Sequence, residues 1–281
     1  MLLVLLCLLL VVPSWAGPVA LRDGLGRPLV LLHRPVRIVS LTPSVTEMLY
    51  ALKLQDRIVG VTSNDDYPPE VKLKPKVGDW HPDYERLIEL HPDLVVMEGR
   101  LAPSTLETLD RLHLPTLALD SSTVEGFHTS VRLVGQATGA SVQAQALLRS
   151  LDARMAAVDA KEKALPASAR PRVFIEIGEA PLQTAGKGTF IDELVRRAGG
   201  DNCYGNVSGY PQVDPEQLLA RRPAVAILTT STVAAFKSRP GCGAVKAYSI
   251  LPPDSIVRPG PRMADGLELL YDLLHRPATG R

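Results

Sequence analysis

One segment of this chain occurs twice, at residues 83–96 and again at residues 214–227. Each copy opens with Asp, has Glu two places later, continues as a short helix with one apolar face, reaches a Pro and ends in an apolar run. Internal repetition constrains the architecture strongly, because each copy must form the same unit. The repeat predicts two similar lobes that present two carboxylates, Glu85 and Glu216, at equivalent places.

Both halves of the chain alternate strand patterns with helix patterns. Short apolar runs rich in Val and Ile predict buried strands, and the alternation is typical of parallel sheets with crossover helices. Residues 17–36, which contain Gly and Pro, predict a short arm or hairpin. The main strands are expected at 37–41, 58–61, 94–97, 116–119, 172–177 and 225–228, and helices at 190–197 and 263–274.

The helix after the first strand has two candidate caps. Thr42 can cap it with Pro43 at the first helical position, a place that suits Pro. Alternatively, Ser44 and Glu47 have the spacing of a capping box. Either cap predicts a helix that begins directly after the strand.

Residues 123–165 carry no strand pattern. Apolar residues recur there at helical spacing, so we expect a long helix that is capped by Ser141 and stopped by Pro166. About 24 residues at 1.5 Å per residue give a rod of roughly 36 Å, which can connect two lobes. The expected division is an N-terminal lobe at 17–122, a linking helical segment at 123–169 and a C-terminal lobe at 170–281.

The N-terminus predicts export. Residues 2–12 form an uncharged apolar run that is too short to span a bilayer. The run fits the core of a secretory signal, and Ser-Trp-Ala at 14–16 fits a cleavage site, so we expect residues 1–16 to be a signal peptide and the mature protein to be periplasmic. An uncleaved anchor is the alternative, because no Lys or Arg precedes the run. Leu6 before Cys7 disfavours lipid attachment, which prefers a small residue there.

The charge and the cysteines bound the function further. The net charge is +1, so nothing suggests a surface for nucleic acid or for an anionic membrane. Two cysteines, Cys203 and Cys242, remain after the signal. An exported protein matures in an oxidising compartment, so a disulfide and two free thiols are both open.

Enzyme signatures are missing or incomplete. Residues 185–189 resemble a phosphate-binding loop, but Pro181 stands where that loop needs a Gly with a free amide. The six His have no spacing typical of a metal-binding helix, and no Gly-x-Ser-x-Gly elbow exists. We therefore expect no enzyme, no catalytic residue, no cofactor and no protein-bound metal.

Aromatic residues make up 5% of the chain, so their positions are informative. Tyr67, Trp80 and Tyr210 all lie in expected loops beside Pro or Gly. A loop aromatic often only covers an edge of the core. In open α/β sheets, however, the ligand lies beyond the carboxyl ends of the strands, where aromatics can line a cleft for a large, flat ligand.

Glu85 and Glu216 have two interpretations. An acidic residue in the first turn of a helix stabilises the helix dipole by about 0.3–1 kcal/mol. The equivalent placement in two lobes also suits a paired docking surface for a two-fold basic partner.

With these residues in view, the chain resembles the helical-backbone (class III) substrate-binding proteins of ABC transporters, and within them the members that bind vitamin B12. Siderophore- and haem-binding members share most of the same features. The matching stretches are 37–41 with 46–47, 66–69, 80 with 85–87, 92–95, 198–202, 211–213 with 216–217, and 258–262.

The resemblance implies two Rossmann-like α/β lobes with parallel sheets, joined by one long α-helix, with the ligand cleft between the lobes. It also implies roles for particular residues. Tyr67, Trp80 and Tyr210 would contact the ligand, with Tyr210 standing where the B12-binding member has Trp. Asp254 and Arg258 would make polar contacts. In that member a cleft Trp follows the strand that ends near residue 97, whereas this chain has Glu98, which could suit a different ligand.

The resemblance further implies a partner. Glu85 and Glu216 match carboxylates that meet arginines on the permease dimer of an ABC importer with its ATPase subunits. We expect a monomer that captures cobalamin as transported ligand, with a ferric siderophore or haem as the alternative. A periplasmic enzyme or a metal-binding scaffold on the same lobes would need a triad, or convergent His and carboxylates.

Overall fold

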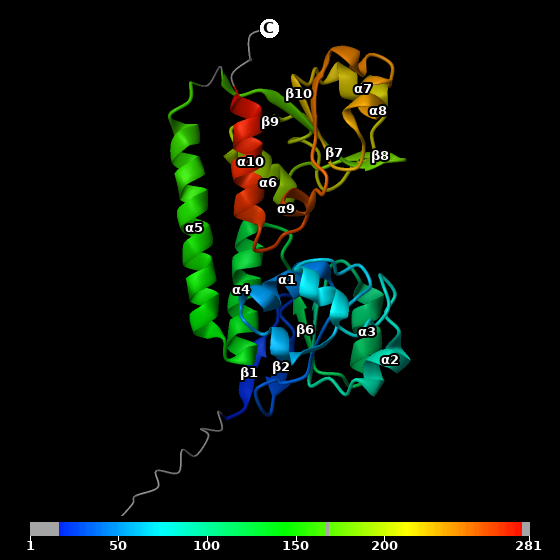
Figure 1. The fold of residues 1–281 in the computed structure, drawn as a ribbon, viewed down its shortest axis with the longest axis vertical. Coiled ribbons are helices and arrows are strands. Elements are labelled where there is room, and N and C mark those ends of the chain that lie inside the picture. The colour runs from blue at the N-terminus through cyan, green and yellow to red at the C-terminus, as the bar shows by residue number, and fades with distance from the viewer. Residues whose placement is uncertain (1–16, 167–168, 277–281) are drawn as a thin grey trace, which may run out of the picture.

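Two lobes lie one above the other beside a long helix in the computed structural model (Figure 1). The model describes residues 17–166 and 169–276, so the expected signal peptide lies outside the described residues. Helix α4 (Val124–Thr138) and helix α5 (Ser141–Lys163) lie between the two sheets in sequence. Figure 1 shows α5 running along one side of the molecule past both lobes, as expected for a continuous linking helix.

The N-terminal lobe is built on a parallel sheet with the strand order β4-β3-β5-β6. The hairpin expected at 17–36 is present as an antiparallel pair of strands, β1 and β2. The elements are β1 (Val19–Arg22), β2 (Pro28–Leu31), β3 (Ile38–Ser40), α1 (Pro43–Ala51), β4 (Ile58–Gly60), α2 (Tyr84–Glu89), β5 (Leu94–Glu98), α3 (Pro103–Arg111) and β6 (Thr116–Leu119).

The C-terminal lobe repeats this order. Its parallel strands run β9-β7-β10-β11, and β8 adds an antiparallel partner to β7. The two repeat copies become α2 with β5 and α7 with β10, so the two lobes predicted from the repeat are confirmed. The elements are β7 (Arg172–Glu179), β8 (Leu182–Thr184), α6 (Phe190–Arg197), β9 (Asp201–Asn202), α7 (Pro215–Ala220), β10 (Val225–Leu228), α8 (Val233–Lys237), β11 (Lys246–Ser249), α9 (Asp254–Val257) and α10 (Met263–His275).

The prediction that Ser141 caps the long helix is wrong. Helix α5 begins at Ser141 itself, its N-cap is Ala140, and no side chain caps it. Helix α4 ends at Thr138, and the following Gly139 has a φ of 75°, the left-handed conformation that Gly adopts readily. This tight turn sends α5 back alongside α4, and Ser141 is already its first helical residue.

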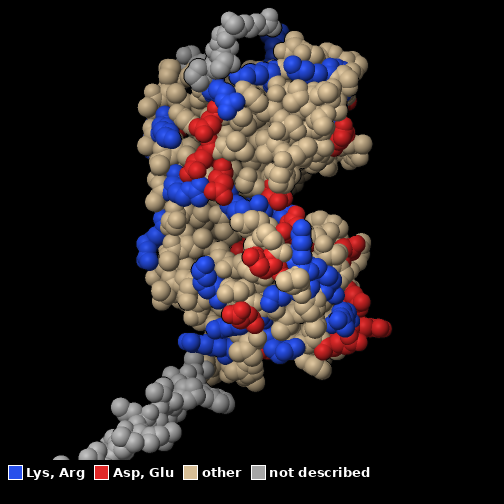
Figure 2. Space-filling view, viewed as in Figure 1, with Lys and Arg blue, Asp and Glu red and all other residues tan. Residues whose placement is uncertain are grey.

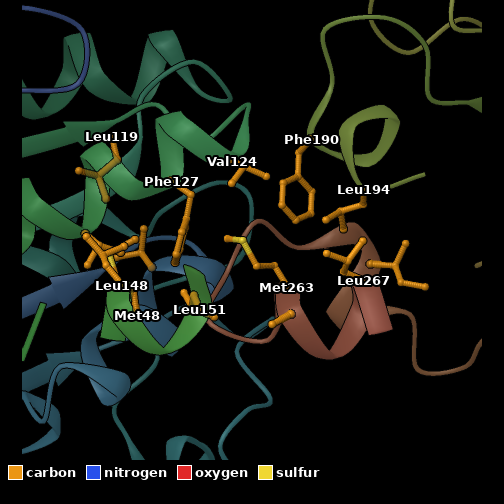
Figure 3. Close-up of a cluster of buried hydrophobic side chains, with 14 of the residues drawn as sticks. Met48, Leu119, Val124, Phe127, Leu148, Leu151, Phe190, Leu194, Met263 and Leu267 are labelled. Carbon is orange, nitrogen blue, oxygen red and sulfur yellow. The ribbon is translucent and has the colours of Figure 1, made fainter. Parts of the chain in front are cut away.

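One apolar core continues from lobe to lobe. Figure 3 shows Phe127 of α4 beside Met48 of α1. Met263 of α10 lies between this pair and Leu194 of α6. All four of these side chains are fully buried. Burying a side chain of this size contributes about 1.5–3 kcal/mol. The shared core therefore couples the lobes through the helices as well as through the chain.

Candidate ligand-binding cleft

A hollow opens between the lobes on the side away from α5 (Figure 2). Strand β6 leads into α4 at this junction, where the backbone N–H of Val124 donates to Glu193 of the C-terminal lobe at 3.1 Å. The carboxyl ends of the parallel strands are the usual place for a ligand in open α/β sheets. Acidic side chains are visible around the hollow in Figure 2.

An ionic network joins the two lobes. Glu47 of α1 accepts hydrogen bonds from Arg262 at 2.6 and 2.8 Å and pairs with Arg258 at 3.4 Å. Arg258 also donates to Asp66 at 2.7 Å. Asp254 pairs with both arginines at 3.3 Å. The expected ligand contacts Asp254 and Arg258 thus lie together, and each already has a partner from its own lobe or the other.

Tyr67 belongs to the same group. The guanidinium of Arg262 lies 4.1 Å from the centre of the Tyr67 ring, a cation–π geometry. Tyr67 as a whole still has 44% of its surface exposed. A hydrogen bond from Arg258 lowers the pKa of the neighbouring Asp66 below its ordinary value, so this carboxylate remains charged at neutral pH.

A tight loop presents Trp80. Gly78 has a φ of 95°, and a Cβ there would lie 2.4 Å from the carbonyl oxygen of His81, so only Gly fits. The Asp79 carboxylate accepts from the backbone N–H of His81 at 2.9 Å, which closes the turn. Trp80 at its tip has 68% of its surface exposed. An exposed Trp held by a fixed loop is a rigid apolar surface for a ligand.

Trp80 lines a cavity of about 290 Å³ in the N-terminal lobe. The other walls come from the carboxyl end of β5, the start of α3 and the loop before α1, and they include Thr42, Glu98 and Leu101. A corrinoid or haem is too large for this cavity alone. The cavity can hold an edge or a side group of a ligand that spans the hollow.

Glu98 forms part of the floor of this cavity, with 6% of its surface exposed. Its Oε2 accepts from the backbone N–H of Ser121 at 3.0 Å, while its Oε1 is buried without a hydrogen-bond partner among the described residues. Burial raises the pKa of Glu98 above its ordinary value; hydrogen bonds from Ser121 oppose this, and the charge of Asp120 adds to it. A buried carboxyl with one unused oxygen is costly unless a partner is supplied.

The cap expected at Thr42 is only partly correct. Thr42 is the N-cap residue of α1, but its side chain does not cap the helix. Its hydroxyl oxygen instead accepts from the backbone N–H of Glu98 at 3.2 Å. Nor does the alternative capping box form, because Glu47 is held by the two arginines. Both polar side chains serve contacts to distant segments.

The C-terminal lobe has a fully buried carboxylate of its own, Glu176 of β7. It accepts from Thr230 at 3.0 Å, from the backbone N–H of Ser231 at 2.9 Å and from Arg239 at 2.6 Å. Every oxygen of this group is therefore occupied. No sequence pattern distinguished it, because its partners lie more than 50 residues away.

Tyr210 lies in a loop of the C-terminal lobe, after β9. Gly209 accepts from Gly186 at 2.8 Å and donates to Lys187 at 3.1 Å, which pins the loop to the segment before α6. The Tyr210 side chain has 51% of its surface exposed. Among the described contacts, none joins Tyr210 to Tyr67 or Trp80.

The repeated glutamates occupy matched positions. Glu85 is the second residue of α2 and Glu216 the second residue of α7, and both side chains are exposed. Asp83 and Asp214 cap these helices with hydrogen bonds of 3.0 and 2.7 Å. Figure 1 shows α2 and α7 at opposite ends of the side that faces away from α5.

Three further observations limit the chemistry. Cys203 and Cys242 are buried free thiols, and burial raises the pKa of Cys203 to about 11.

Within residues 17–166 and 169–276, no group of three His, Cys, Asp or Glu side chains could hold a metal ion. No helix in that same part of the chain is both long and apolar enough to cross a membrane.

A larger hollow of about 720 Å³ lies elsewhere on the N-terminal lobe, between α3 and the loop that joins β1 to β2. Its lining includes Leu25, Arg27 and Asp110 but no aromatic residue. The cavity beside Trp80 has the aromatic surface and the buried polar group that a ligand site needs, so volume alone does not identify the site.

Comparison with known proteins decides the family. Residues 38–249 match the periplasmic binding protein family. The chain belongs to this family. An uncharacterised ABC transporter substrate-binding lipoprotein of Bacillus subtilis, YvrC, is 32% identical over 92% of this chain and 86% of its own length. A vitamin B12-binding protein of Pectobacterium atrosepticum is 32% identical over 69% of this chain and 71% of its own length.

Solved structures of periplasmic binding proteins show the same two-lobed fold. The vitamin B12-binding protein BtuF of Vibrio cholerae matches with a TM-score of 0.75 and 25% identity, over 85% of this chain and 96% of BtuF. A periplasmic haem-binding protein of Pseudomonas aeruginosa matches with a TM-score of 0.74 and 25% identity, over 87% of this chain and 94% of that protein. The expected class of substrate-binding protein is confirmed, and overall similarity favours neither ligand.

Proposed function

We propose that this binding protein captures a corrinoid of the vitamin B12 class in the cleft and delivers it to an ABC importer. The observation that carries the proposal is Trp80, which a fixed loop holds exposed beside a cavity of the N-terminal lobe. The similarity to vitamin B12-binding proteins over two thirds of the chain supports the same ligand. No bond is made or broken, and cobalamin would be cargo.

The ligand contacts come from both lobes in this proposal. Trp80 and Tyr67 would cover apolar surface from the N-terminal lobe, and Tyr210 would do so from the C-terminal lobe. Arg258 and Asp254 would meet polar side groups at the edge of the ionic network. A ligand placed this way touches the two lobes at once, which suits a cargo much larger than the cavity of about 290 Å³.

A haem or a ferric siderophore is the second candidate. The similarity to a haem-binding protein equals the similarity to BtuF in identity and fold, which supports this alternative. Haem carries two carboxylates, and many siderophores are anionic. The two candidates therefore differ mainly in charge.

Delivery would depend on Glu85 and Glu216. Their matched placement on α2 and α7 suits two equivalent basic sites on a permease dimer, with the ATPase subunits on its other side. We further propose that residues 1–16 direct export and that the protein acts outside the cytoplasm as a monomer. Expression of the full chain followed by N-terminal sequencing of the exported protein tests the start at Gly17.

Isothermal titration of the purified protein tests the ligand. Cyanocobalamin, haem and a panel of ferric siderophores are titrated separately into the wild type and into Trp80→Ala. We expect one-to-one binding of cyanocobalamin, weakened about tenfold or more by Trp80→Ala through loss of a large apolar contact. Saturable binding of haem or a siderophore without binding of cyanocobalamin would replace the proposal with the second candidate.

A further inference from the structure

The ring of Tyr67 belongs to the N-terminal lobe, but a side chain of the C-terminal lobe holds it. The guanidinium carbon of Arg262 lies 4.1 Å from the centre of the ring, so the cation covers one aromatic face. Among the aromatic and cation–π contacts of residues 17–166 and 169–276, Tyr67 takes part in this one alone. The direction of the ring therefore depends on where Arg262 is held.

Arg262 is itself held at two points. Its Nε and Nη2 donate to the two carboxylate oxygens of Glu47 at 2.8 and 2.6 Å, and such a paired contact fixes the plane of the guanidinium. Glu47 has 4% of its surface exposed, so little water competes for it. Asp254 of the C-terminal lobe pairs with the same guanidinium at 3.3 Å. The cation over Tyr67 is thus fixed from both lobes.

The loop that carries Tyr67 is fixed within its own lobe. The buried Asp65 carboxyl accepts from the backbone N–H of Thr62 at 2.9 Å, and the Asp65 N–H donates to the Thr62 carbonyl at 3.2 Å. Tyr67 is nevertheless exposed over nearly half of its surface. Since Arg262 covers one face of the ring, the exposed part is the other face and the ring edges. The loop therefore sets where the ring is attached, and Arg262 sets which way it points.

We propose that Arg262 is a positioning residue for ligand binding: it holds Tyr67 in the direction that the bound ligand needs. The proposal rests on the proposed function, in which Tyr67 contacts a corrinoid. Arg262 acts through the ring and does not itself have to touch the ligand. Glu47 supports the same arrangement from the N-terminal lobe, because it fixes Arg262.

The physical basis is ordering before the ligand arrives. A side chain that is free to rotate must be ordered on binding, and the lost rotational freedom weakens affinity. A ring that is already held loses little freedom, so more of its contact with the ligand appears as affinity. Because Arg262 comes from the other lobe, the ring is held in this way only while the two lobes keep their contact.

Loss of Arg262 also loosens the contact between the lobes, so the test must separate the two effects. Arg262→Met keeps the length of the side chain and removes the cation and both hydrogen bonds to Glu47. Tyr67→Ala removes the ring. A double-mutant cycle of these two substitutions isolates the part of the Arg262 effect that passes through the ring. A general loosening lowers affinity equally with and without Tyr67.

Two further variants complete the set. Arg154→Met is the matched control, because Arg154 donates to both carboxylate oxygens of Glu268 at 2.9 and 2.7 Å, the same paired geometry. The described hydrogen bonds of Arg154 go to α10 and not to the Tyr67 loop. Arg262→Lys keeps a cation that can pair with Glu47 and lie over the ring, so it should restore most of the affinity.

Dissociation constants for cyanocobalamin are measured by titration calorimetry at pH 7.5, with a thermal midpoint recorded for each variant. We expect Arg262→Met alone to weaken binding about three- to tenfold, the range for ordering one side chain. In the Tyr67→Ala background the same substitution should change affinity by less than about twofold. Arg262→Lys and Arg154→Met should each stay within about twofold of the wild type.

A measurement without ligand tests the positioning directly. The ring carbons of the seven Tyr are labelled with 13C, and the Tyr67 signal is identified by its absence from Tyr67→Phe. Arg262→Met should lower the NMR order parameter of the Tyr67 ring, and Arg154→Met should leave it unchanged.

Three results would overturn the proposal. Arg262→Met leaves the Tyr67 ring as ordered as in the wild type, or leaves the affinity unchanged, or weakens binding as much without Tyr67 as with it. Failure of the wild type to bind cyanocobalamin would instead defeat the proposed function, and the order parameter alone then decides whether Arg262 positions Tyr67.

Discussion

The two lobes share a fold, but one buried carboxyl group in each, Glu176 and Glu98, differs in how fully it is hydrogen-bonded. Glu176 in the C-terminal lobe has three hydrogen-bonding partners, including Arg239 at 2.6 Å. Glu98 in the N-terminal lobe has one partner for its carboxyl group and one oxygen without any among the described residues. The two lobes therefore have the same strand order but differ in the hydrogen bonding of these two buried carboxyl groups. A complete set of hydrogen bonds offsets the cost of burying the Glu176 carboxylate, whereas part of that cost remains at Glu98.

The largest effect, a loss of uptake, is expected from helices α2 and α7, which carry Glu85 and Glu216 at equivalent positions in the two lobes. Reversing both charges, Glu85→Lys with Glu216→Lys, should abolish uptake in cells, because both basic sites of the permease would meet like charge. Ligand affinity should stay within twofold, since both side chains are exposed and neither lines the cavity. Uptake assays and titration of the purified variant measure the two effects.

The control for docking is Glu107→Lys, the same reversal on an exposed residue of α3. It should leave uptake near the wild-type level. A large loss of ligand affinity in the double variant would contradict a pure docking role. If Glu85→Lys and Glu216→Lys alone reduce uptake to different extents, the two lobes contribute unequally to docking on the permease.

The next effect concerns the buried carboxylates themselves. Arg239→Ala leaves Glu176 buried without its cation and should destabilise the protein by about 3–5 kcal/mol. Glu98→Gln removes no ion pair and should change the free energy of unfolding by less than about 1 kcal/mol. Urea unfolding followed by circular dichroism compares the two. Similar losses of stability in the two variants would contradict the expected difference between the Glu176 and Glu98 sites.

The ionic network between the lobes offers a smaller contrast. Glu47→Gln removes the buried partner of both arginines and should cost about 2 kcal/mol, in the range of hydrogen bonds to charged groups. Asp66→Asn removes an exposed partner of Arg258 and should cost less than about 1 kcal/mol. Thermal unfolding in low and high salt measures both, and the Asp66 effect should shrink further in high salt.

The smallest effect is a pH dependence. The pKa of Glu98 is raised above its ordinary value of about 4.5, mainly by burial, so the folded protein holds this proton to higher pH than the unfolded chain. Its contribution to stability therefore falls as pH rises from about 4.5 through the raised pKa. Glu98→Gln lacks this fall and should gain stability relative to the wild type over that interval. A constant difference between the two proteins across pH 4–8 would contradict the shift.

Local patterns predicted most of the fold. The helix expected at 190–197 is observed as Phe190–Arg197, and the long helix ends within two residues of its expected stop. These elements follow from apolar spacing and from the positions of Gly and Pro, which are local. Strands β8 and β11 were missed, because each is three or four residues long and carries no strong apolar alternation.

The site was predictable only in part. The loop aromatics and the glutamates of the repeat could be found from the sequence, although their roles remain predictions. The pairing of Glu47 with Arg262 joins residues 215 positions apart, and no local spacing signals it. The hydroxyl of Thr42 looked like a helix cap but serves the backbone of Glu98. Such contacts depend on how the two lobes meet.

The most direct test of the account uses Trp80 as a reporter. The chain has two Trp residues, and the other is Trp15 in the expected signal, so protein beginning at Gly17 has Trp80 alone. Cyanocobalamin absorbs light and should quench this fluorescence when bound in the cleft. The account predicts saturable one-to-one quenching at micromolar ligand or below, with no such curve for free tryptophan under the same conditions. A signal that matches free tryptophan at every concentration would contradict a corrinoid held between the lobes.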